Sequence, residues 1–141
     1  MIILDTNVVS EPMKANGDPR VRAWLDRQAI ATLYLTATSL AELLTGVEML
    51  PEGRRRQGLA AALNDLLEKL FGSRILPFDK QAAVAYAQLV SRARAEGKIL
   101  SVGDGQIAAM AAVQGFTVAT RDTAPFVAAG VPVINPWEAR Q

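Results

Sequence analysis

Two acidic residues follow apolar segments of this sequence. Asp5 comes directly after the run Met1–Leu4, and Asp122 comes just after the run Phe116–Thr120. Short apolar runs of this kind predict buried strands. Ligands of open parallel sheets bind beyond the carboxyl ends of the strands. Both carboxylates are therefore expected to face a ligand-binding crevice.

Two more acidic residues lie near the predicted starts of helices. Glu42 comes three residues after Ser39, and Asp104 comes three residues after Ser101. Each serine is typical of a helix N-terminus, so both carboxylates are expected in first turns. A helix that follows one parallel strand, or precedes the next, places one of its ends at the edge where the strands end. We expect these first turns on the same side of the sheet as Asp5.

Four carboxylates without basic partners repel one another, which raises their pKa values. A divalent cation removes that cost, and the chain contains no His and no Cys. Any metal must therefore be held by oxygen, which favours Mg²⁺ or Mn²⁺. Such a site can activate a water molecule for attack on phosphorus. The predicted metal ligands are Asp5, Glu42, Asp104 and Asp122.

Each of these carboxylates also has a purely structural interpretation. Asp5 and Asp122 can cap the turn or the short helix that follows them. Glu42 and Asp104 can form capping boxes with the serine three residues earlier. Four caps at one end of a fold are harder to explain together than one metal site, which favours the metal interpretation.

Polar residues adjoin the strand-end carboxylates. Thr6, Asn7 and Thr120 are candidates to hydrogen-bond a metal-bound water or a phosphate oxygen. Asn7 equally fits an Asx-turn. Arg121 is a candidate substrate contact, or a solvated residue at the end of a strand.

The densest basic run in the chain consists of Arg54, Arg55 and Arg56. It can bind RNA phosphates or lie near a protein partner, although such a run is more often a solvated loop between helices. The apolar stretch Leu59–Phe71 and the residues Trp24 and Trp137 are expected chiefly to pack in the core.

The 141 residues are half hydrophobic and carry a net charge of +1, which suits one globular domain over residues 1–141. The absence of His and Cys excludes Ser-His-Asp catalysis, disulfides and thiolate zinc sites. No apolar run approaches the roughly 20 residues of a membrane helix, and the first apolar run is too short for a signal peptide. We expect no membrane association and a cytoplasmic location.

Predicted strands alternate with helices along the chain, which indicates an α/β fold with a mostly parallel sheet. The strands are expected at Met1–Leu4, Thr32–Ala37, Arg74–Phe78, Phe116–Thr120 and Val131–Ile134. The helices are expected at Arg20–Arg27, Ser39–Leu50, Leu59–Phe71, Asp79–Glu96, Ser101–Gly115 and Asp122–Gly130. A loop is expected around Pro12 and Gly17.

An ordered set of short motifs resembles the PIN-domain family. The motifs are Ile3-Leu4-Asp5-Thr6-Asn7-Val8, Ala41-Glu42-Leu43, Asp104-Gly105-Gln106-Ile107-Ala108-Ala109 and Ala119-Thr120-Arg121-Asp122. The opening Leu4–Pro12 and the closing Asn135-Pro136-Trp137 are similar to the FitB-like branch of the VapC toxins. The resemblance covers essentially the whole chain.

This resemblance implies a three-layer α/β/α sandwich with five strands in the order 3-2-1-4-5. It also implies a Mg²⁺- or Mn²⁺-dependent endoribonuclease acting on structured RNA such as transfer RNA, with the family's metal ligands at Asp5, Glu42, Asp104 and Asp122. The implied partners are a second copy of the chain and a small antitoxin, which blocks the site and contacts promoter DNA. DNA would then be bound only through the antitoxin.

Three other functions share features of this pattern. Haloacid-dehalogenase-type enzymes need a second Asp two positions after the first, where this chain has Asn7. Response-regulator receivers need paired acidic residues at the first strand, and Asp5 has no acidic neighbour. The serious alternative is a PIN-fold binding module that works mainly through an antitoxin and DNA complex, with little nuclease activity.

Overall fold

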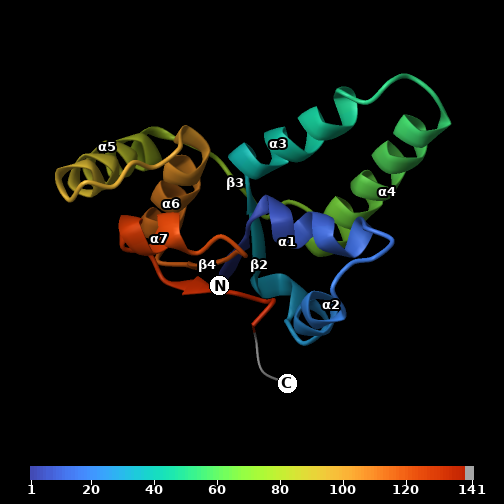
Figure 1. Ribbon diagram of the computed structural model, residues 1–141, viewed down its shortest axis with the longest axis horizontal. Coiled ribbons are helices and arrows are strands. Elements are labelled where there is room, and N and C mark those ends of the chain that lie inside the picture. Colours follow the sequence, from blue (N-terminus) through green and yellow to red (C-terminus); the bar gives the residue numbers. More distant parts are fainter. Residues whose placement is uncertain (139–141) are drawn as a thin grey trace.

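The computed structural model, which describes residues 1–138, is built on a parallel sheet of five strands (Figure 1). The strands are β1 (Ile2–Leu4), β2 (Leu33–Thr36), β3 (Ile75–Leu76), β4 (Thr117–Ala119) and β5 (Val133–Ile134). Their order is β3-β2-β1-β4-β5, and each neighbouring pair is parallel. The α/β class and the strand order 3-2-1-4-5 are thereby confirmed. β1 is central, with β4 beside it in register, so that Leu4 lies opposite Ala119.

Seven helices occur in residues 1–138. They are α1 (Thr6–Ser10), α2 (Pro19–Asp26), α3 (Ala37–Glu48), α4 (Arg54–Leu70), α5 (Lys80–Ala95), α6 (Val102–Gln114) and α7 (Ala124–Ala129), with 3-10 turns η1 (Glu11–Met13) and η2 (Ile30–Thr32). In this part of the chain, no helix is both long and apolar enough to cross a membrane.

The sheet separates two hydrophobic clusters, because successive strand residues point to opposite faces. Leu4 packs with Val8, Trp24 and Leu63, on the face that α1 to α4 cover. Ile3 packs with residues of α5, α6 and α7 on the other face. Figure 1 shows this division, with α3 and α4 extending to one side of the strands and α5 to α7 gathered on the other. Trp24 and Trp137 are each 5% exposed and belong to the first cluster, as expected for core residues.

The start of α3 corrects a prediction that bears on the site. The helix begins at Ala37, and the Thr36 hydroxyl accepts a hydrogen bond from the Ser39 amide at 3.0 Å. Thr36 is therefore the N-cap, where Ser39 was expected. Glu42 consequently lies in the second turn of α3 and cannot form a capping box with Ser39.

Two other segments differ from the sequence-based expectation. The helix expected at Leu59 begins at Arg54, so the three arginines occupy its first turn and not a loop. Residues 6–13, expected as a loop, form α1 and η1. Helix α1 is only 5 residues long and contains Thr6, Val8 and Val9, whose branched side chains lower helix propensity. No periodic pattern can reveal so short a helix.

Helix α6 lies unusually close to α5 at Gly105. A Cβ atom on this buried glycine would come within 2.8 Å of Tyr86 Cε2 and 3.2 Å of Val90 Cγ2. The Tyr86 ring is itself packed edge-on against Phe78, with 6.0 Å between the ring centroids. The glycine next to Asp104 thus permits α6 to approach α5, and so sets where Asp104 lies.

We predict that Gly105→Ala destabilises the protein. Overpacking of this kind costs about 1–3 kcal/mol, whereas alanine gains up to about 1 kcal/mol over glycine in a helix interior. The free energy of unfolding, measured by urea denaturation, is expected to fall by about 1–2 kcal/mol. The control is Gly58→Ala in α4, where an added Cβ meets nothing within 4 Å and should stabilise. Equal stabilisation by both substitutions would contradict the packing argument.

Candidate metal-binding site

Asp5 is at the centre of the candidate site. It follows β1 directly, its backbone amide donates to Ala119 O of β4 at 2.9 Å, and its side chain is 8% exposed. Asp5 Oδ1 accepts a hydrogen bond from the Thr6 amide at 2.8 Å, which makes Asp5 the N-cap of α1. Asp5 therefore does serve as a helix cap, and this role occupies one of its two carboxylate oxygens.

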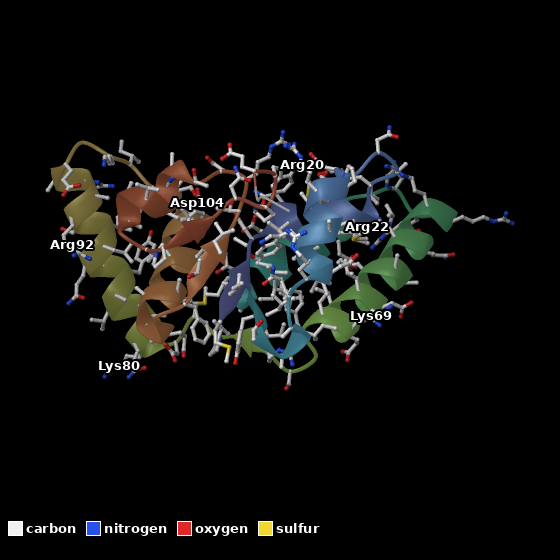
Figure 2. All side chains as sticks on the ribbon, turned by 90° about the horizontal axis from the view of Figure 1, so that it is seen from below. Arg20, Arg22, Lys69, Lys80, Arg92 and Asp104 are labelled. Carbon is white, nitrogen blue, oxygen red and sulfur yellow. The ribbon has the colours of Figure 1, made fainter. Side chains whose placement is uncertain are left out.

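The other three carboxylates surround Asp5 at the carboxyl ends of the strands. Glu42 lies on α3, Asp104 lies in the first turn of α6 (Figure 2), and Asp122 lies in the loop between β4 and α7. Burial raises the pKa of Asp5 above its ordinary value, and the negative charges of Asp104 and Asp122 raise it further. The hydrogen bonds from Thr120 and Thr6 oppose this increase without cancelling it.

Glu42 experiences the same electrostatic environment. Its pKa is raised first by burial and then by the charges of Asp5 and Asp104. No cationic side chain is among the groups that shift the pKa of Glu42 or Asp5. Asp5 is therefore within electrostatic range of Glu42, Asp104 and Asp122, and no cation of the described residues offsets the repulsion that Asp5 and Glu42 experience.

Helix capping does not account for the carboxylates of Asp122 and Asp104. Helix α7 has Thr123 as its N-cap residue, with no side-chain cap, so Asp122 does not cap it. Ser101 does cap α6, and its hydroxyl accepts a hydrogen bond from the Asp104 amide at 3.1 Å. That bond uses the backbone of Asp104 and leaves its carboxylate available to the site.

The hydroxyl of Thr120 connects two of the acidic residues. This fully buried side chain donates to Asp5 Oδ2 at 2.8 Å and accepts from the Asp122 amide at 3.1 Å. Asn7 Nδ2 also donates to Thr120 Oγ1, at 3.4 Å. A hydroxyl has one donor and two acceptor sites, so that of Thr120 is fully used within the protein. It orients Asp5 and the start of the Asp122 loop.

Asn7 and Arg121 form the outer part of this arrangement. Asn7 Oδ1 accepts a hydrogen bond from the Arg121 amide at 3.3 Å, so Asn7 joins α1 to the end of β4 and does not form a local Asx-turn. The Arg121 guanidinium carbon lies 5.2 Å from the centroid of the buried Trp137 ring. This cation–π contact holds an exposed cation beside the loop that carries Asp122.

The donor set fits a divalent cation that keeps part of its hydration shell. Among residues 1–138, no group of three or more His, Cys, Asp or Glu side chains is placed to hold one ion directly. Mg²⁺ typically takes one or two direct carboxylates and keeps several waters, so this spacing suits a largely hydrated ion. The buried Thr6 hydroxyl lies beside the Glu42 carboxylate and lowers the pKa of Glu42 as a hydrogen-bond donor would, although the contact does not meet strict hydrogen-bond geometry.

Two cavities adjoin the acidic residues, one on each side of α3. The first, of about 730 Å³, lies between α3 and α6 and is lined by Glu42, Asp104 and Ser101 among others. The second, of about 600 Å³, lies among α1, α3 and α4. Of the three arginines at the start of α4, Arg55 lines the second of these two cavities, and the other two line neither. Arg56 is paired with Glu48 at 2.6 Å.

Sequence reasoning did not find the contact that fixes the two helices next to the first cavity. Thr38 Oγ1 of α3 donates to Gln106 Oε1 of α6 at 2.8 Å. The two residues are 68 positions apart, and no local pattern distinguishes them from other polar residues on helices. Only the packing of α3 against α6 brings them together.

Comparison with known proteins places the whole chain in one family. The PIN domain profile matches residues 2–131. The chain is 49% identical to the VapC ribonuclease Y4jK of Sinorhizobium fredii, covering 98% of this chain and 99% of that protein. It is 47% identical to Toxin FitB of Neisseria gonorrhoeae, over 97% of this chain and 99% of FitB. A solved structure of FitAB bound to an IR36 DNA fragment superimposes with a TM-score of 0.95 at 45% identity, covering 100% of this chain and 99% of that one.

We predict that Asp5→Asn stabilises the metal-free protein at neutral pH. Because the pKa of Asp5 is raised in the folded state, its ionised form destabilises the fold. The stability that protonated Asp5 contributes is fully present below its unfolded pKa. It is lost as the pH rises through its higher pKa in the folded state. In thermal melts with a chelator, the advantage of the variant should be largest near about pH 7 and vanish below about pH 4. A variant less stable at every pH would indicate that Asp5 serves mainly as a helix cap.

We predict that Thr120→Val destabilises the protein and that Thr120→Ser does not do so to the same extent. Valine preserves the shape but leaves Asp5 Oδ2 and the Asp122 amide without their partner. Unsatisfied groups of this kind cost about 1–3 kcal/mol each. Urea denaturation should show a loss of at least about 1 kcal/mol for Thr120→Val. Similar losses for both variants would mean that packing, and not the hydroxyl, is what matters at this position.

Proposed function

The chain belongs to the PIN-domain family, in its VapC and FitB branch, and we propose that it is a metal-dependent endoribonuclease acting as the toxin of a toxin–antitoxin pair. One observation carries this proposal: Asp5 lies at the carboxyl end of a parallel sheet near three other carboxylates, and burial, together with repulsion among these charges, raises the pKa of Asp5 and Glu42. A site of this kind is suited to a divalent cation and a phosphodiester. The name of the relative VapC ribonuclease Y4jK supports the same activity.

In the proposed mechanism, Asp5, Glu42, Asp104 and Asp122 would hold Mg²⁺ or Mn²⁺. The ion, when bound, would activate a water for attack on phosphorus and stabilise the leaving oxygen. Thr120 fixes the orientation of the Asp5 carboxylate, and the Thr6 hydroxyl lies beside the Glu42 carboxylate. The cation of Arg121, held on the Trp137 ring, is available to an RNA phosphate.

The proposed partners follow from the same family. The solved FitAB complex contains DNA, and we propose that this chain also has a small antitoxin, contacts DNA only through it and forms a homodimer. An antitoxin segment in the second cavity would cover Arg55 and one side of Glu42, and would thereby block the site. The substrate would be a structured RNA such as a transfer RNA, met in the cytoplasm.

A second candidate function is a binding module that acts mainly through its antitoxin and DNA complex. The described residues contain no direct three-carboxylate ligand set, which is the observation in its favour. The uncompensated repulsion among the acidic residues weighs against it, since a module without a metal would gain stability by replacing them.

We predict that Mg²⁺ or Mn²⁺ raises the melting temperature of the protein and that Asp5→Asn and Asp104→Asn abolish this increase. Ligand binding to the native state stabilises by RT ln(1 + [L]/Kd). The same two variants should lose metal-dependent RNA cleavage and toxicity on overexpression. Asp65→Asn is a suitable control, because Asp65 is an exposed carboxylate on α4 that lines neither cavity.

These measurements separate the two functions. RNA cleavage at the normal rate by Asp5→Asn or Asp104→Asn would refute the carboxylate mechanism. A wild-type protein that is neither stabilised by metal nor active on RNA would support the binding module.

A further inference from the structure

Glu42 and Asp104 come from opposite layers of the fold. Helix α3, which carries Glu42, packs through Leu43 and its neighbours in the first hydrophobic cluster. Helix α6, which carries Asp104, packs through Ile107 and its neighbours in the second cluster. Figure 1 shows the two helices on different sides of the strands. Since neither cluster contains residues of both helices, a shared core does not fix the distance between these two carboxylates.

The contact between the two helices includes a hydrogen bond between their side chains. Thr38 Oγ1 of α3 donates to Gln106 Oε1 of α6 at 2.8 Å, in a partly buried position. Residues 1–138 contain no other hydrogen bond or ion pair between α3 and α6. Threonine is branched at Cβ, which restricts its χ1 rotamers, so the Thr38 hydroxyl is closely tied to the backbone of α3. This hydrogen bond is therefore the polar contact that sets the separation of the two helices.

The Glu42 carboxylate lies one helical turn from this hydrogen bond. Glu42 follows Thr38 by four residues on α3, and Gly103 comes three residues before the glutamine on α6. Both spacings place the two residues on one face of their helix. A Cβ atom on Gly103 would lie 3.5 Å from Glu42 Oε1, so this carboxylate lies against the first turn of α6, next to Asp104. The charge of Asp104 is accordingly one cause of the raised pKa of Glu42.

We propose that Thr38 and Gln106 are positioning residues of the metal site. Their hydrogen bond fixes the distance between the carboxylates of Glu42 and Asp104, which line the cavity of about 730 Å³ between α3 and α6. Thr38 lines the same cavity, but its hydroxyl hydrogen is donated to Gln106, so it acts through the helices and not on the ion. The inference rests on the metal binding of the proposed function and not on its RNA cleavage.

Electrostatic repulsion explains why such a contact is needed. The like charges of Glu42 and Asp104 repel each other in the metal-free protein, which pushes α3 and α6 apart. The Thr38–Gln106 hydrogen bond opposes this movement and holds the two carboxylates at one separation before an ion binds. Residues that orient metal ligands in this way, without binding the ion themselves, increase metal affinity.

Four substitutions distinguish the hydrogen bond from the shape of the side chains. Thr38→Val preserves the shape and removes the donor, Gln106→Leu removes the acceptor, and Thr38→Ser keeps a hydroxyl. The control is Thr32→Val, because Thr32 Oγ1 donates to Ala29 O at 2.6 Å and lines neither cavity beside α3. The control also removes a threonine hydrogen bond, but at the start of β2, whereas the acidic residues lie at the carboxyl ends of the strands.

The experiment measures the affinity of the full-length protein for Mn²⁺ from the electron paramagnetic resonance signal of the free ion. Thr38→Val and Gln106→Leu should each weaken Mn²⁺ binding by at least about tenfold, the loss that is typical of residues that orient metal ligands. The double variant should bind within about twofold of either single variant, because all three lack the same hydrogen bond. Thr38→Ser and Thr32→Val should stay within about threefold of the wild type. Cooperative urea unfolding shows that a variant is folded, and either single variant tests the inference if the other does not fold.

Unchanged Mn²⁺ affinity in the folded Thr38→Val or Gln106→Leu variant would overturn the inference, and so would an absence of Mn²⁺ binding by the wild type. Equal weakening by Thr32→Val would assign the loss to general destabilisation, and multiplied losses in the double variant would assign it to two independent effects. Both results would also overturn the inference. Selective weakening in a protein whose wild type cleaves no RNA with Mn²⁺ would support the positioning role and refute the nuclease function.

Discussion

The buried negative charge of Asp5 is the constraint on which the rest of the site depends. A carboxylate that is 8% exposed needs hydrogen-bond donors, and Asp5 receives one from the Thr6 amide and one from the Thr120 hydroxyl. The hydrogen bond from the Thr6 amide caps the N-terminus of α1. The hydrogen bond from the Thr120 hydroxyl connects the end of β1 to the end of β4. Since Thr120 also accepts from the Asp122 amide, the same hydroxyl that satisfies Asp5 fixes the loop carrying Asp122. Local structure and site geometry are thus determined together.

Much of the fold was predictable because its signals are local. Apolar runs ending in polar residues marked the five strands. Asp79 and Ser101 mark the starts of their predicted helices, and both cap them in the structure, because a cap acts within three residues of itself. The strand order could not be predicted from such local signals. It followed from the family resemblance, because the periodicity of hydrophobic residues does not indicate which strands are neighbours. Helix α1 escaped detection because a 5-residue helix is shorter than any periodic pattern.

The carboxylates of the site were predictable for a physical reason, whereas their supporting contacts were not. Strand ends and helix starts lie at one edge of a parallel sheet, so the sequence positions of the four acidic residues already implied proximity. The hydrogen-bond partners of Thr120 depend on how closely β4 approaches β1. The Thr38–Gln106 hydrogen bond depends on the packing of α3 against α6.

The spacing of the carboxylates also connects the metal to the substrate. An ion held directly by only one or two carboxylates keeps coordination positions for water and phosphate oxygen. An RNA phosphate beside Glu42 would occupy such a position, so that metal and RNA would each strengthen the binding of the other. Such coupling is reciprocal by thermodynamic necessity, so metal should bind the free protein measurably and bind more tightly when RNA is present.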